Sequence, residues 1–134
     1  VASLELARRY LLDSDQPIID SPEKAVELLS DIRDKKQEYF VCLTLDGANR
    51  LIAKRVVTIG TLTASLVHPR EVFADAIADR AASIIVAHNH PSGSLRPSQV
   101  DITTTERLKH AGELLGVPLV YHLLITKQSF RIID

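Results

Sequence analysis

Three side chains in the second half of the sequence belong to the types that bind transition metals. His88 and His90 are separated by one residue, and Asp101 follows His90 by eleven positions. Residues two apart in an extended strand point to the same face, so both imidazoles face one side. The loop at 91–97 contains two prolines and a glycine and lets Asp101 fold back toward the strand end. Two histidines and a carboxylate, with a fourth position for water, form the ligand set of a catalytic zinc, so the sequence predicts an open Zn²⁺ site.

Hydrolysis at such a site also needs a proton acceptor. Zinc lowers the pKa of a water molecule to roughly 7, and a free carboxylate nearby can then take the proton. Glu38 is the candidate, because it stands at the start of a predicted central strand, directly before a run of apolar residues. Glu71 is a rival, although its position also suits the first-turn acid of a helix.

The elements that must position these residues alternate between strands and helices. A helix is expected from Pro22, capped by Ser21, to about Lys35, and a second helix begins at Pro69. The remaining expectations are strands at 39–45, 51–59, 83–87, 119–126 and 130–133, and a weak helix at 4–12. A third helix is also expected, with Asp101 in its first turn, an apolar stripe over 102–115 and Gly116 at its end. Strands with helices on both sides predict a three-layer α/β fold with a mixed sheet.

Composition limits the class of protein. The chain has 134 residues, 46% of them hydrophobic, which is enough for one domain with one sizeable core. Its net charge of -1 and scattered basic residues give no support to a nucleic-acid surface. The single cysteine, Cys42, suits a reducing cytoplasm, and no apolar stretch reaches the ~18 residues of a membrane span. The chain starts at Val1 and contains no methionine, so we expect a piece of a longer polypeptide.

Several of these residues also have a purely structural interpretation. Ser98 and Asp101 have the spacing of a helix capping box, and this role can coexist with a functional one. His68 suits the entry of a helix, and His110 and His122 are expected to be structural. Cys42 is expected to be a small core residue.

The motif also resembles that of a known family. His88-x-His90, seven residues and then Ser98-x-x-Asp101, with Glu38 upstream, resembles the JAMM metalloprotease motif. The longer segment at 88–93, with 68–71 before it, is similar to the RadC family of bacterial proteins, historically labelled DNA repair. The resemblance covers residues 21–134.

This resemblance implies a function and an architecture. It implies that His88, His90 and Asp101 bind Zn²⁺, that Glu38 acts as general base, and that Ser98 donates a hydrogen bond to the developing oxyanion. The implied reaction is hydrolysis of an amide or isopeptide bond in a protein or peptide substrate. The implied fold is the three-layer JAMM domain, similar to cytidine deaminases, over 21–134. Residues 1–20 would then be a linker or the remnant of an upstream helical domain.

Departures from the family pattern narrow the function. JAMM deubiquitinases usually have Ser or Thr where this chain has Asn89, so ubiquitin cleavage is not implied. The HNH nuclease motif is spread over a larger unit than the three consecutive residues 88–90, so a nuclease is not implied. Nucleotide deaminases need a Cys-x-x-Cys pair, whereas this chain has only Cys42, so a deaminase is not implied either. One alternative is a DNA-repair-associated module that binds nucleic acid or protein without hydrolysis, with nucleic acid reached through a missing N-terminal domain. Another is a protein-interaction domain that has lost its activity.

Overall fold

The computed structural model describes residues 16–60 and 67–134, and the helix expected at 4–12 lies outside them. A five-stranded sheet with the order β2-β1-β3-β4-β5 forms the middle layer of this described part. Its strands are β1 (Tyr39–Leu45), β2 (Leu51–Ile59), β3 (Ser83–Asn89), β4 (Leu119–Ile125) and β5 (Phe130–Ile133). β3 and β4 are parallel, and the other neighbouring pairs are antiparallel.

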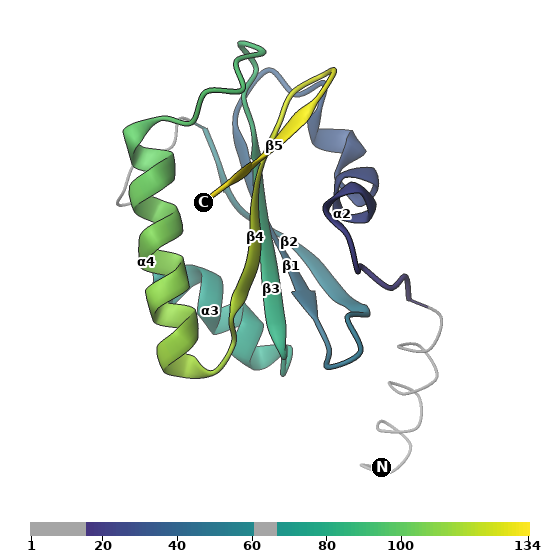
Figure 1. Ribbon diagram of the computed structural model, residues 1–134, viewed down its shortest axis with the longest axis vertical. Helices are drawn as coiled ribbons and strands as arrows, with labels where there is room; N and C mark the ends of the chain where they lie inside the picture. The colour runs from purple at the N-terminus through teal and green to yellow at the C-terminus, as the bar shows by residue number, and fades with distance from the viewer. Residues whose placement is uncertain (1–15, 61–66) are drawn as a thin grey trace.

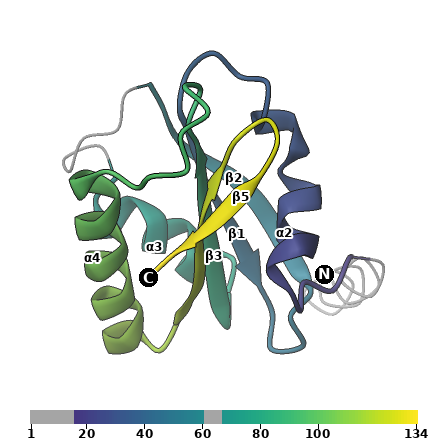
Figure 2. The same cartoon turned by 45° about the horizontal axis from the view of Figure 1, so that its top comes forward.

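Helices cover both faces of the sheet. α2 (Pro22–Leu28) lies on one face, and α3 (Pro69–Ala78) and α4 (Gln99–Leu115) lie on the other (Figure 1). The same separation is visible after the rotation in Figure 2. The predicted three-layer α/β fold with a mixed sheet is therefore confirmed.

Alternation along the strands divides the buried side chains into two cores. Val41 and Leu43 of β1 and Ile85 of β3 belong to the core under α2. Their neighbours in the sequence, such as Phe40 and Val86, belong to the core under α3 and α4. Because successive side chains of a strand point to opposite faces, the row that contains Val86 continues at residue 88. The imidazole at that position therefore points toward α4.

The first helix is shorter than predicted. α2 ends at Leu28 instead of continuing to Lys35, and a 3₁₀ turn at Ser30–Ile32 follows it. Side chains three apart lie on the same side of a 3₁₀ turn, which lets Leu29 and Ile32 both enter the core under α2. Within residues 16–60 and 67–134, no helix is both long enough and apolar enough to cross a membrane.

The boundaries nearest the predicted site agree with the sequence signals, with one correction. His68 caps α3, and Pro69 is its first residue. Gly116 ends α4 with a φ of 74°, a left-handed conformation that glycine adopts at little cost. β3 continues to Asn89, two residues beyond the predicted strand, because its pairing extends to that residue. His88 is therefore part of the strand and not of the loop after it.

Gly112 of α4 allows close packing and provides a test of the fold. A Cβ there would lie 2.6 Å from the carbonyl oxygen of Val117 and 3.3 Å from Cζ of Phe73. Alanine is favoured over glycine in a helix by about 1 kcal/mol, but backbone at 2.6 Å cannot move aside cheaply. We expect Gly112→Ala to lower the free energy of unfolding by about 1–3 kcal/mol in urea titrations. Gly47→Ala, where a Cβ meets open space, is the control, and a Gly112→Ala protein as stable as wild type would contradict this packing.

Candidate metal centre

Local pairing brings the three predicted ligands to one place. His88 lies in β3 opposite Phe40 of β1. His90 follows the end of the strand, where its backbone N–H donates to the carbonyl of Ile125 at 3.0 Å and continues the pairing with β4. Asp101 lies in the first turn of α4, and its carboxylate contacts the imidazoles of both histidines. One strand with the residue that follows it, and the first turn of one helix, thus supply the three side chains.

Their donor atoms converge closely. Nε2 of His88 lies 3.1 Å from Oδ1 of Asp101, and Nε2 of His90 lies 3.2 Å from Oδ2. The two Nε2 atoms are 3.2 Å apart. Ligand atoms about 2.0–2.1 Å from a tetrahedral zinc ion are separated by roughly 3.3 Å, so the spacing fits a small divalent ion. The cluster of His88, His90 and Asp101 could hold a metal ion, as the sequence predicted.

The outer hydrogen bonds decide where the imidazole protons lie. Nδ1 of His90 is 3.0 Å from the backbone carbonyl of Ser94, which can only accept, so this nitrogen carries the proton. When His90 is neutral, its Nε2 is then a bare acceptor that faces Asp101. Bare acceptors converging on a carboxylate need a cation or additional protons between them, which is the chemistry of a metal site.

The hydrogen bonds of His122 likewise decide which nitrogen of His88 carries the proton. Thr105 in α4 donates its hydroxyl proton to the carbonyl of Asp101 at 2.8 Å. The same oxygen lies 2.5 Å from Nδ1 of His122, so it accepts a proton from that nitrogen. Burial lowers the pKa of His122 to about 3, and a neutral ring has only this one proton. Nε2 of His122 therefore accepts from Nδ1 of His88 at 2.9 Å, which leaves Nε2 of His88 as a lone pair for a metal.

Sequence reasoning treated His122 as structural and did not consider Thr105. Both side chains are buried, but His122 is hydrogen-bonded to the candidate ligand His88, and Thr105 is hydrogen-bonded to the backbone of the candidate ligand Asp101. Thr105 follows Asp101 by four residues, one helical turn, so it lies on the same face of α4. That spacing is the only signal in the sequence that links either residue to the site.

Asp101 remains ionised in spite of its burial. Burial is the largest influence and raises the pKa of its carboxyl group. When Nε2 of His88 carries a proton in place of a metal ion, its hydrogen bond and positive charge, together with hydrogen bonds from Ser98, outweigh burial and hold this pKa below its usual value. An ionised carboxylate is the form that binds a divalent ion.

The capping box predicted for α4 is confirmed. Oγ of Ser98 accepts from the backbone N–H of Asp101 at 3.1 Å, and Oδ2 of Asp101 accepts from the N–H of Ser98 at 2.8 Å. The first bond uses a lone pair of the Ser98 hydroxyl and leaves its proton able to donate elsewhere. Structural capping and a functional role are therefore compatible at this residue.

A cleft of about 420 Å³ opens at the centre. Its lining includes Glu38, His90, Ser98 and Asp101, with Ser92, Ser94, Arg96 and Val100. The candidate base thus faces the same space as two of the ligands. Glu71 is not among the described residues that line the cleft, and it lies beside Arg70 at the start of α3.

The side chain of Asn89, between the two histidines, forms hydrogen bonds to the backbone on both sides of Glu38. Its Oδ1 accepts from the N–H of Tyr39 at 2.6 Å, and its Nδ2 donates to the carbonyl of Gln37 at 3.0 Å. Asn89 is 1% exposed, so losing either bond would leave a buried polar group unpaired. Alternation along β3 turns Asn89 away from the histidines, as expected, and directs it to the start of β1.

The fold and the centre define a mixed α/β domain with a buried His-His-Asp cluster beneath a helix start. Residues 19–132 match the family model described as RadC-like JAB domain, and the chain belongs to this family. The resemblance to the RadC family drawn from the motif is thereby confirmed.

Curated relatives agree with this family. A UPF0758 protein of Methanospirillum hungatei is 48% identical over 131 residues, covering 95% of this chain and 58% of the relative. UPF0758 proteins of Bacillus licheniformis and Shouchella clausii are 48% and 46% identical over 97% and 96% of this chain, and 59% and 57% of their own lengths. The chain thus spans less than two thirds of these relatives, whose names state no activity.

The histidine chain can be tested by metal affinity. Thr105→Val keeps the shape of the side chain but removes the hydroxyl that orients His122, whereas Thr105→Ser keeps the hydroxyl. We expect Thr105→Val to weaken Zn²⁺ binding by about 10- to 100-fold in competition with a chromophoric chelator, and Thr105→Ser to stay close to wild type. Nitrogen-15 NMR should find the Nδ1–H tautomer at His88 and His122 in the zinc-loaded protein. An Nε2–H tautomer at His122 would contradict the assigned direction of the hydrogen bonds.

The Asn89 contacts can be tested by hydrogen exchange. Asn89→Leu has a similar size but cannot bond to the backbone at residues 37 and 39. We expect the amide of Tyr39 to exchange at least about tenfold faster, which corresponds to 1.4 kcal/mol of lost local stability. The amide of Leu43, in the middle of β1, serves as the internal control. Unchanged protection of Tyr39 would mean that Asn89 does not hold this segment.

Proposed function

We propose that this domain is a zinc-dependent hydrolase that cleaves an amide or isopeptide bond in a protein or peptide. The observation that carries the proposal is the convergence of His88, His90 and Asp101 beside a cleft that Glu38 also lines. Membership of the RadC-like JAB family supports it, since the motif resembles that of the JAMM metalloproteases.

The donor set favours zinc over the harder cations. Two imidazole nitrogens and one carboxylate oxygen suit zinc, whereas Mg²⁺ and Ca²⁺ prefer oxygen ligands alone. Three protein ligands leave one coordination position for a reactant, and His90 keeps 12% of its side chain exposed toward the cleft. A divalent ion bound here would act as a Lewis acid toward the amide carbonyl and lower the pKa of water to about 7.

The chain's own residues would transfer the proton, stabilise the oxyanion and bind the ion. The contacts of Asn89 hold the backbone on both sides of Glu38. The Glu38 carboxylate would accept a proton from the attacking water in the first half of the reaction and give it to the leaving nitrogen in the second half. Ser98, whose proton is not used by the capping bond, would donate to the developing oxyanion. His88, His90 and Asp101 would bind and orient the ion.

The test separates metal binding from turnover. We expect His88→Ala and Asp101→Ala to lose zinc in metal analysis, and the exposed control His110→Ala to keep it. Glu38→Gln should retain a full complement of zinc but lose roughly 10²- to 10⁴-fold in the rate of peptide-pool cleavage followed by mass spectrometry. Glu71→Gln is the matched control and should cleave at the wild-type rate.

Two outcomes would overturn the proposal. Wild-type metal content in His88→Ala and Asp101→Ala would remove the metal site. Binding of DNA that falls steeply with salt and is indifferent to Glu38→Gln, with no peptide cleavage, would favour the DNA-associated alternative.

A further inference from the structure

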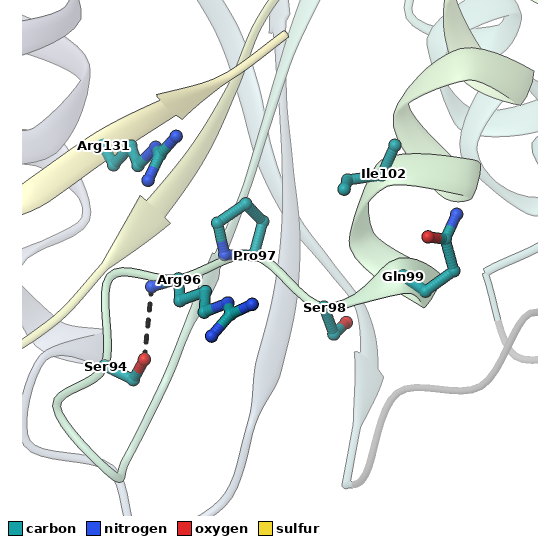
Figure 3. A pocket seen from close by; sticks show the side chains of 7 residues that line it. All are labelled: Ser94, Arg96, Pro97, Ser98, Gln99, Ile102 and Arg131. Carbon is teal, nitrogen blue, oxygen red and sulfur yellow. Dashed lines mark hydrogen bonds between the residues drawn. The ribbon is translucent and has the colours of Figure 1, made fainter.

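A second groove adjoins the metal cleft. Its volume is about 670 Å³, and it is lined by Ser94, Arg96, Pro97, Ser98, Gln99, Ile102 and Arg131 (Figure 3). Ser94, Arg96 and Ser98 also line the metal cleft, so the two spaces adjoin at these residues. A peptide bound across the metal centre would therefore extend into this groove.

The groove is positively charged. Its described lining contains two arginines and no acidic residue. Figure 3 shows the side chains of Arg131 from β5 and Arg96 from the loop reaching in, with the start of α4 opposite. Arg55 on β2, by contrast, is paired with Asp79. Among the described residues, neither Arg96 nor Arg131 has an acidic partner within salt-bridge distance, so both guanidinium groups are available to a ligand.

The start of α4 and two apolar residues also shape the groove. The first turn of α4 begins at Gln99, and the positive end of the helix dipole there favours an anion beside the two arginines. Pro97 and Ile102 give the groove apolar surface that the methylene groups of a side chain can cover. A flexible acidic side chain fits this combination better than a small inorganic anion does.

We propose that this groove is a subsite for a carboxylate of the peptide substrate, carried by an acidic side chain or by the chain terminus. Guanidinium groups bind carboxylates through paired, charge-assisted hydrogen bonds, and two of them can hold one carboxylate in a defined orientation. The inference rests on the proposed function, because it assumes that a peptide crosses the metal centre. It adds a preference for acidic substrates on the side of the scissile bond that faces β5.

Binding of matched peptides tests the subsite without requiring cleavage. The protein is the zinc-loaded Glu38→Gln chain, and the probes are acetylated, amidated alanine pentapeptides with a central glutamate or glutamine. An all-alanine pentapeptide with a free C-terminus distinguishes a terminal carboxylate from a side chain. NMR titration should give at least fivefold tighter binding of one carboxylate peptide than of the glutamine peptide, with shifts at the side-chain Nε–H of Arg96 and Arg131.

Variants then assign the preference to the groove. We expect Arg96→Gln and Arg131→Gln each to bring the affinities for the carboxylate and glutamine peptides to within about twofold of each other. Lys109→Gln, which removes one exposed positive charge from α4 outside the groove, should leave the preference intact. Equal binding of glutamate and glutamine peptides, or a preference that survives in the double arginine variant, would overturn the subsite. Tighter binding of a thymidine decanucleotide at the same arginines would also overturn it, in favour of a nucleic-acid surface.

The failures of the two proposals are distinguishable. Cleavage of peptide pools by the wild-type chain without any acidic preference would overturn the subsite and leave the hydrolase. Carboxylate-dependent binding without cleavage would support the subsite as a binding site and overturn the hydrolase.

Discussion

The burial of an ionised Asp101 together with the imidazoles of His88 and His122 under α4 is the constraint on which the rest of the structure depends. An unpaired charge or polar group in this environment costs several kcal/mol, so each must have a partner. Asp101 is paired with Ser98 and the ligand histidines, and Thr105 and His122 complete the set behind His88. Among the described residues, the one buried side-chain polar atom without a partner is Oγ1 of Thr58, on β2.

This constraint couples the helix to the sheet. Asp101 closes the capping box of α4 with one carboxylate oxygen while both oxygens face the ligand histidines. Thr105, one turn later, bonds to both the helix backbone and His122 of β4. The parallel pairing of β3 and β4 brings His88 and His122 to the same sheet face. Geometry at the centre is therefore maintained by the same bonds that dock α4, which is how a metal ligand is oriented in general.

The residues that line the cleft come from segments that meet where β3 ends and β1 begins. Asn89 ties the start of β1, and with it Glu38, to the end of β3. The loop that carries Ser94 and Arg96 lines both the metal cleft and the adjoining groove that reaches β5. Family membership establishes the fold of this chain, whereas the chemistry is argued from these side chains, because one fold can serve many reactions.

Local pattern was enough to predict the fold class, the strand and helix order, and the residues of the metal cluster. His88, His90 and Asp101 are close in sequence, and strand alternation and a capping box are short-range rules. The predicted end of α2 was wrong, because the spacing of Leu29 and Ile32 fits both an α-helix and the 3₁₀ turn that packs into the core. The roles of His122 and Asn89 depend on contacts with residues 34 and 50 positions away in the sequence. Only the tertiary structure decides such contacts, since they follow from strand order and register, which no local spacing encodes.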